Sequence, residues 1–447
     1  MSATSIDTRP VQLPATSIPG GPPGPARVLL ADVEALADVD CTHPQGGLYS
    51  TVWVLALRRG APLGIVEIEV SSPTIAADEL EARLRQGLGQ MWDLEVAEES
   101  DAIALPRASV VVATNVTRPE ELLACVARLS ELDYPDYEVL VVENRRTTAR
   151  GDDVLEDLRG LPRVRVLAER RPGTSAARNR GLAAASGEIV AFTDDDVEVD
   201  RRWLRALAGR LVEEPGVDAV SGLVVPKELE TPAQIWFEQS GSGVDRVYTR
   251  LSFELAARGR HAGGVLSGAR FRVLRKRAPD SRVSAVSLYA VGEFGIGSNM
   301  AVRRDVLGEL GGFDETLGPG TPAKAAEDLA LLLELLSAGR GIAYEPRALV
   351  HHVNRRTVEE LERQISGYGV GFTAMLVGLI WRDPRHLFGL IAMTPRALRS
   401  TFSRSSIKQS RRPDSYPPQL SRAELRGMLA GPLAYVRSRR AQRRWSR

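Results

Sequence analysis

The segment that decides the fold is RRPGTSAARNRGLAAASGEIVAFTDDD, residues 170–196. Its first part has helical spacing, and EIVAFT is a short, nearly continuous apolar run that ends in three aspartates. Apolar runs of this kind are typical of parallel strands that are buried on both faces. The segment therefore predicts a helix and then a buried strand, with Asp194, Asp195 and Asp196 at the carboxyl end of that strand.

The same alternation continues towards the N-terminus. The apolar runs are SVVVAT (109–114), YEVLVVEN (137–144) and VRVLAE (164–169), separated by the helical stretches PEELLACVARLSEL (119–132) and DDVLEDL (152–158). Strands that alternate with helices predict an α/β fold, a mostly parallel sheet flanked by helices. Ligands of such sheets bind beyond the carboxyl ends of the strands. The residues placed there are Thr114, Asn115, Glu143, Asn144 and the three aspartates.

The aspartate cluster indicates a metal site. Crowded carboxylates are costly unless a cation neutralises them. In an extended chain Asp194 and Asp196 point to the same side and Asp195 to the other. Mg²⁺ and Mn²⁺ prefer such oxygen ligands and often also bind substrate phosphates. The cluster therefore predicts a metal ion bound between these carboxylates and a diphosphate. The alternative is an acidic turn without function.

At this point the sequence resembles the family 2 glycosyltransferases, in which a G-x-S-x-A-R-N-x-G stretch precedes the strand that carries D-x-D. Here the stretch consists of Gly173, Ser175, Ala177, Arg178, Asn179 and Gly181. The resemblance continues through GSNMAVRRDVLGELGGFDETLGPGTPAKAAEDLALLLELLSAGRGIAYEP (297–346) and covers about residues 108–355. It implies a GT-A fold, the fold of nucleotide-diphospho-sugar transferases.

The resemblance also implies roles for single residues. Those expected to bind the nucleotide sugar are Thr114, Asn115, Glu143, Asn144, Arg178, Asp194, Asp195 and Asn299. Glu143 stands where the family usually has Asp. Asp196 would be the main ligand of Mn²⁺ or Mg²⁺, with Asp194 and His352 as further ligands; an ordinary, satisfied histidine is the alternative for His352.

Asp328 would be the general base on the acceptor side, with Glu327 orienting the acceptor or sharing the proton. Acids at a helix start also favour the helix dipole, and both interpretations of this pair can hold together.

The predicted function is inverting, metal-dependent transfer of a sugar from a nucleotide sugar to a hydroxyl group. A UDP-sugar is the expected donor, and the acceptor is an unidentified glycan, lipid, peptide or small molecule. Two alternatives stay open: a sugar nucleotidyltransferase, and a non-catalytic protein that binds sugar nucleotides or glycans. Nucleotidyltransferases usually carry a glycine-rich phosphate loop at the N-terminus, and none precedes Ala108.

The flanking regions predict further units. Residues 1–26 are rich in Pro, Gly, Ser and Thr, which indicates a disordered tail without the apolar core of a secretory signal. Residues 27–105 indicate a small α/β domain, in which STVWVLAL (50–57) and GIVEIEV (64–70) form a hairpin and a helix opens at Ser72 or Thr74. Residues 106–356 form the expected catalytic domain.

The C-terminal region divides into an apolar helical part, 357–400, and a basic tail, 401–447. Residues 365–381 carry no charge but several glycines, so a buried helix pair or an interfacial hairpin fits better than a membrane span. Residues 396–447 hold 14 Lys or Arg against two acids, whereas the rest of the chain holds 44 against 55. This basic region favours an anionic membrane surface; a core or dimer helix with a solvated tail is the alternative.

The remaining composition narrows the setting. The basic tail has few aromatic residues and the body is acidic, so nucleic acid is not an expected partner. Two cysteines, Cys41 and Cys125, lack metal-ligand spacing and exclude a disulfide scaffold. A reducing compartment is therefore expected, which predicts a cytoplasmic protein, with peripheral attachment to the inner face of the plasma membrane left open.

Overall fold

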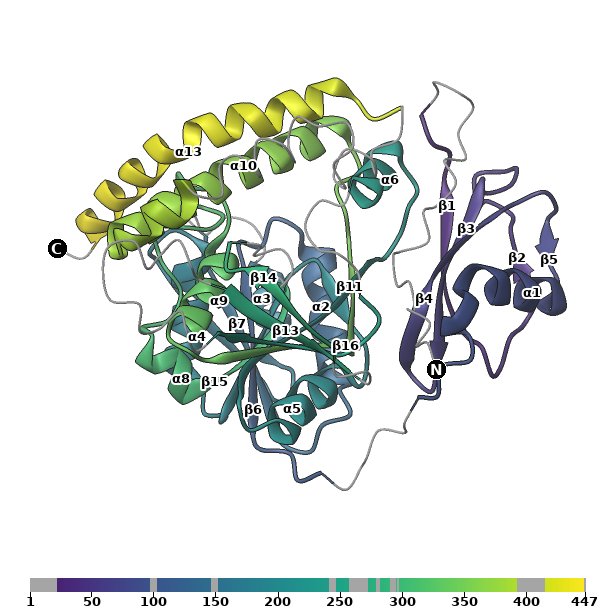
Figure 1. The fold of residues 1–447 in the computed structure, drawn as a ribbon, viewed down its shortest axis with the longest axis horizontal. Coiled ribbons are helices and arrows are strands. Elements are labelled where there is room, and N and C mark those ends of the chain that lie inside the picture. Colours follow the sequence, from purple (N-terminus) through teal and green to yellow (C-terminus); the bar gives the residue numbers. More distant parts are fainter. Residues whose placement is uncertain are drawn as a thin grey trace.

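The structure, a computed structural model, describes residues 22–96, 103–145, 152–240, 247–256, 272–278, 282–289, 295, 297–391 and 415–445. Most of the tail predicted over residues 1–26 lies outside the described residues. The chain forms a small N-terminal domain, a large α/β domain and a pair of long C-terminal helices (Figure 1). The predicted α/β fold with a C-terminal helical region is confirmed.

The N-terminal domain is a three-stranded sheet covered by one helix. Its order is β1 (Ala26–Asp32), β3 (Thr51–Arg58) and β4 (Ala61–Glu69), and β3 and β4 form the predicted antiparallel hairpin. Helix α1 (Ala77–Leu88), followed by the short helix η1 (Gly89–Met91), begins later than predicted. The reason is that β5 (Thr74–Ile75) pairs with β2 (Val39–Asp40), so the chain is still extended at Thr74.

The central sheet has a parallel half that holds the predicted strands. Here β8 (Val164–Ala168), β7 (Tyr137–Glu143), β6 (Ala108–Thr114) and β9 (Ile189–Asp194) run in parallel. Their alternate side chains enter two separate hydrophobic cores, which is why the runs are apolar almost throughout. The sequence pattern located these four strands correctly because burial on both faces leaves few polar positions.

The other half of the sheet is mixed. Strand β15 (Asn299–Arg303) lies antiparallel between β9 and β11 (Val217–Pro226), and β11 pairs in parallel with β16 (Gly341–His352). The edge is formed by the antiparallel strands β12 (Leu251–Leu255), β13 (Arg272–Arg277) and β14 (Arg282–Ser287). A short strand, β10 (Val197–Val199), pairs with the end of β16 and so brings residue 352 next to the aspartate cluster.

Helices cover both faces of this sheet. Helices α2 (Pro119–Ser130), α3 (Asp152–Arg159) and α5 (Trp203–Glu213) pack in one core. Helices α4 (Thr174–Ala184), α8 (Arg304–Glu309) and α9 (Glu327–Ser337) pack in the other. Cys125 on α2 is fully buried in the first core, as the sequence predicted.

The C-terminal helices lie against each other and against the body. Helix α10 (Val358–Arg382) follows a short segment after β16, and α13 (Pro418–Trp445) occupies most of the predicted basic tail as an ordered helix (Figure 1). Their backbones touch: a Cβ atom at Gly427 would lie 2.2 Å from the carbonyl oxygen of Ser366. Helix α10 is long and apolar enough to cross a membrane by length and composition, and half of its most apolar window is buried inside the molecule.

Candidate active site

The three aspartates at the end of β9 diverge. Strand β9 ends at Asp194, and residues 195 and 196 form a turn before β10. The expectation that Asp194 and Asp196 share one side of an extended chain is therefore wrong. Asp194 turns to Arg178, with 2.8 Å between Oδ1 and Nη2, whereas Asp195 Oδ2 accepts a 2.6 Å hydrogen bond from the hydroxyl of Thr114.

Burial makes Asp195 hard to ionise. Only 8% of the residue is exposed. Burial first, and then the neighbouring Asp196 carboxylate, raises the pKa of Asp195 to about 6. Thr114 also accepts a 2.9 Å hydrogen bond from the backbone N–H of Val116, so its hydroxyl both donates and accepts within the protein. Thr114 and Asp195 therefore stabilise the shape of the strand end.

Asp196 lies in the most positive part of the site. Its Oδ2 accepts a 2.7 Å hydrogen bond from Arg118 Nη1 and lies 3.5 Å from Arg355 Nη2, and its Oδ1 lies 3.6 Å from His352 Nε2. Burial raises the pKa of Asp196, but the charges of His352, Arg118 and Arg355 outweigh this and leave the pKa lowered. Asp196 is therefore held as a carboxylate among groups that also suit phosphate.

His352 is oriented as metal-binding histidines commonly are. Its Nδ1 lies 3.0 Å from Asn354 Oδ1, and the amide nitrogen of Asn354 donates to Glu238 over 2.7 Å, which fixes the amide with its oxygen towards the ring. When the ring is protonated, Nε2–H faces the Asp196 carboxylate as an ion pair; a bound cation would take the place of that proton, between Nε2 and Asp196. Two acceptors that face each other suit a shared cation.

These residues fit a divalent metal as a partial ligand set. Among the residues that the structure describes, no group of three or more His, Cys, Asp or Glu side chains forms a complete metal cluster. Mn²⁺ and Mg²⁺ nevertheless often take few protein ligands and complete their coordination with water and substrate phosphates. Asp196 and His352 are the pair that could hold such an ion here.

The predicted acid pair opens helix α9. Glu327 is 6% exposed, whereas Asp328 is half-buried and more accessible. Asp328 Oδ2 accepts a 2.7 Å hydrogen bond from the backbone N–H of Gly297. A Cβ atom at Gly297 would lie 2.6 Å from Asp328 Cβ, so a larger residue there would displace this carboxylate. The Asp328 side chain is thus fixed in place by a neighbouring loop.

Arg178 joins the two acid groups. Its Nη1 lies 2.9 Å from Glu327 Oε1 and its Nη2 lies 2.8 Å from Asp194 Oδ1. The residue is 2% exposed, so it serves as an internal bridge rather than as an open phosphate contact. Burial first, and then the Asp328 charge, raises the pKa of Glu327 to about 7 against the opposing effect of Arg178.

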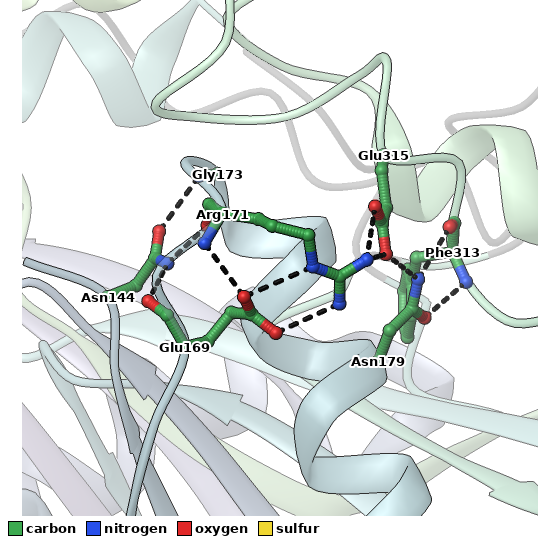
Figure 2. Close-up of polar contacts among 7 residues, drawn as sticks. All are labelled: Asn144, Glu169, Arg171, Gly173, Asn179, Phe313 and Glu315. Atoms are coloured by element: carbon green, nitrogen blue, oxygen red, sulfur yellow. Dashed lines mark hydrogen bonds and ion pairs between the residues drawn. The ribbon is translucent and has the colours of Figure 1, made fainter. Parts of the chain in front are cut away.

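The rest of the motif around Arg178 fastens loops to α4 (Figure 2). The side-chain amide of Asn179 donates over 2.9 Å to the carbonyl of Phe313 and accepts over 2.8 Å from its N–H. Arg171 binds Glu315 with 2.8 Å to both carboxylate oxygens and also binds Glu169. The loop before α4 and the loop before α9 are therefore held in a fixed relation.

Two residues expected to bind the nucleotide sugar hold the backbone instead. The amide of Asn144 donates to the carbonyls of Glu169 and Arg171 and accepts from the N–H of Gly173 (Figure 2). Asn299 is fully buried: it donates to two backbone carbonyls and accepts from the indole of Trp203. Both amides are satisfied within the protein.

The other predicted residues lie at the strand ends. Asn115 is exposed and accepts from the hydroxyl of Thr117 over 2.7 Å, and Glu143 is buried and paired with Arg145 at 2.5 Å. Sequence reasoning missed Arg118 and Asn354. Arg118 stands in the strand-end segment VATNVTRPEE, where a basic residue just before a helix was the available signal; Asn354 gave none.

The fold is a mixed α/β sheet covered by helices, with acid groups at the end of β9 and the start of α9. Residues 109–311 match the family described as Glycosyl transferase family 2, which confirms the resemblance over this segment that the motifs predicted. The match ends before Glu327 and Asp328, whose placement therefore depends on the structure. The names of the relatives agree with a resemblance to glycosyltransferases over this part of the chain.

Several known proteins are similar to this chain. The pre-mycofactocin glycosyltransferase of Mycobacterium tuberculosis is 30% identical over 197 residues, which is 44% of this chain and 33% of that protein. The glucosyl-dolichyl phosphate glucuronosyltransferase of Haloferax volcanii is 23% identical over 55% of this chain and 69% of its own length. The chain thus spans a third of the first relative.

The chain also matches solved structures, at low sequence identity. A mannosyltransferase from Pyrobaculum calidifontis, in complex with GDP-Man and Mn²⁺, has a TM-score of 0.45 and 17% identity. The similarity covers 78% of this chain and 92% of that one.

Proposed function

We propose that this protein is an inverting, metal-dependent glycosyltransferase that moves a sugar from a nucleotide sugar, a UDP-sugar in the first instance, to an acceptor hydroxyl group. The observation that carries the proposal is the Arg178 bridge. One buried guanidinium contacts Asp194 at 2.8 Å and Glu327 at 2.9 Å. The strand-end cluster and the α9 acid pair therefore border one site, as displacement at a sugar carbon requires.

The strand-end side suits the donor. Asp196 and His352 would hold the metal ion, which, when bound, would stabilise the negative charge of the departing diphosphate. Arg118 and Arg355 surround the same carboxylate and can pair with phosphate oxygens, since guanidinium groups bind such oxygens through directed hydrogen bonds. The donor diphosphate would therefore lie against these groups.

The α9 side suits the acceptor. Asp328 is oriented by the N–H of Gly297 and is more exposed than Glu327, so its carboxylate can reach a hydroxyl group. As that oxygen attacks the anomeric carbon, Asp328 would take its proton, and the bond to the diphosphate would break. Glu327 holds Arg178 in position and is too buried to meet the acceptor directly.

The test is nucleotide release from UDP-, GDP- and dTDP-sugars with and without Mn²⁺, for the wild type, Asp196→Ala and Asp328→Asn. We expect Asp196→Ala to lose metal-dependent release. Asp328→Asn should bind nucleotide normally in calorimetry but fail to turn over. Asp153→Asn, an exposed acid on α3, is the matched control and should behave as the wild type.

Each arm can contradict the proposal. If no donor binds, the transferase assignment is wrong. If a donor binds to the wild type but is not turned over, either alone or with any acceptor of a panel, a non-catalytic protein that binds sugar nucleotides becomes the better description. Full activity after removal of divalent metal would leave the transferase assignment but refute the role of Asp196 as a ligand.

A further inference from the structure

Helix α13 presents a row of leucines to solvent. Leu425, Leu429 and Leu433 are 44%, 76% and 55% exposed, and their spacing of four residues puts them on one face. We call them the leucine row. The opposite face of α13, with the small residues Gly427 and Gly431, packs directly on the backbone of α10. In Figure 1, α13 lies on the outer side of α10, away from the sheet.

Exposed arginines flank the leucine row, and one of them, Arg426, lies within it. Helix α13 contains seven arginines and one acid, Glu424. The exposed ones are Arg422 and Arg426 near the start, and Arg437, Arg440, Arg443 and Arg444 after the row. The remainder of the chain, residues 1–395, has an excess of acids. Positive charge is therefore concentrated on the helix that exposes the leucines.

Two exposed tryptophans lie towards the same end of the helix pair. Trp381, near the end of α10, is 62% exposed and stacks with Arg439 of α13, whose guanidinium lies 4.4 Å from the ring centroid. Trp445, the last residue of α13, is 55% exposed. Tryptophan is enriched where apolar lipid meets water, since its ring is apolar and its N–H polar.

This combination fits a lipid surface better than a second copy of the chain. Two leucine rows brought together would also bring together their arginines, and like charges oppose such a contact. A span is not indicated for α13, because the stretch between Arg426 and Arg437 is too short to cross a bilayer. A helix that lies in the plane of an anionic bilayer instead buries its leucines and directs its arginines to lipid phosphates.

We propose that the outer face of α13 is a docking surface for an anionic lipid bilayer. The leucine row enters the boundary between headgroups and acyl chains, and the arginines contact the phosphates. The proposal is independent of the proposed function. It has a consequence for the site, because Gly371 of α10 packs on Ala325, two residues before Glu327. The same helix pair would thus support both the membrane contact and the loop before the acid pair.

The test is co-sedimentation of the full chain with vesicles of mixed phosphatidylglycerol and phosphatidylcholine, and with phosphatidylcholine alone. We expect binding to the anionic vesicles only, weakened by salt. The variant L429S/L433S should bind at least about tenfold more weakly, because two exposed leucines no longer enter the lipid. R440Q/R443Q/R444Q should lose a similar amount.

The matched control is L123S/L161S, which replaces two leucines that are 37% and 38% exposed outside α13. It should bind as the wild type, and circular dichroism should show that all variants are folded. The proposal is overturned if the wild type does not bind anionic vesicles, or if L429S/L433S binds them normally. Light scattering that shows a dimer dissolved by L429S/L433S, without vesicle binding, would assign the face to a second copy.

Discussion

The two acid groups of the site are constructed in different ways. Asp196 follows a strand and is surrounded by Arg118, Arg355 and His352. Glu327 and Asp328 begin a helix: Glu327 pairs with one guanidinium, that of Arg178, and Asp328 accepts from backbone N–H groups. One group is rich in positive partners and the other is poor in them.

The consequence appears in the proton affinities. Burial opposes ionisation of both groups, but the positive neighbours leave the pKa of Asp196 lowered, whereas the pKa of Glu327 is raised to about 7. A carboxylate that stays ionised suits cation and phosphate binding. Glu327, whose pKa is raised, is instead partly protonated near neutral pH. The number of cationic side chains near each buried carboxyl group therefore determines which of the two stays ionised.

The largest expected effect tests the α9 side. Asp328→Asn should lower turnover by about 10²–10⁴-fold, the usual contribution of a general base. The amide keeps an oxygen for the N–H of Gly297, so nucleotide affinity should not change. Steady-state kinetics with the donor that the nucleotide-release experiment identifies, together with calorimetry, measures both quantities. Equal losses of affinity and turnover would show that Asp328 acts in binding rather than in catalysis.

Removing the Arg178 guanidinium should destabilise both the strand-end side and the α9 side of the site. Arg178→Met leaves Asp194 and Glu327 without their common partner, which should cost about 3–5 kcal/mol of unfolding free energy, the usual effect of breaking a buried ion pair. Chemical denaturation measures this. Arg159→Met, which removes an exposed pair with Glu156, should cost no more than about 1 kcal/mol. Similar losses in the two variants would contradict the bridge.

The pH dependence of stability separates Glu327 from an ordinary buried carboxylate. Because its folded pKa is raised from 4.5 to about 7, Glu327 contributes stability that is complete below about pH 4.5 and is lost as the pH rises through about 7. Relative to Glu327→Gln, the wild type should therefore lose at most about 3 kcal/mol across this window. Denaturation at a series of pH values measures the difference.

Glu138 is the reference for this measurement, because its pKa is shifted in the opposite direction to that of Glu327. Hydrogen bonds from Ser186, Arg165 and Ser109 outweigh burial and lower its pKa from 4.5 to about 2. Its contribution is complete above about pH 4.5 and is lost as the pH falls through about 2. Parallel curves for the two glutamates would refute the assignment of Glu327.

The smallest effect tests the strand-end side. Asn354→Ala removes the partner of His352 Nδ1, which should weaken Mn²⁺ binding in the presence of nucleotide by about 10–100-fold, as for other outer-shell partners of metal ligands. Calorimetric titration with Mn²⁺ measures the change. Gln86→Ala, at an exposed amide of α1 in the N-terminal domain, is the control. Unchanged Mn²⁺ affinity in Asn354→Ala would argue against His352 as a ligand.

Much of the site could be located from the sequence. The apolar runs before Thr114, Glu143 and Asp194 predicted three strand ends, and these ends meet at one edge of the sheet. The motif around Arg178 predicted the family segment, which the comparison confirms over residues 109–311. The direction of each side chain could not be predicted, because the polar partners of Asn144 and Asn299 come from segments far away in the chain.

The sequence alone determined the succession of strands and helices, since burial on both faces of a sheet leaves a pattern that local spacing reveals. The tertiary structure decided which charges meet. Strand β10 pairs with the end of β16, which places His352 beside Asp196, and the close approach of the Gly297 loop orients Asp328. Electrostatic and hydrogen-bonding interactions depend on distances between segments far apart in the chain, and only folding sets those distances.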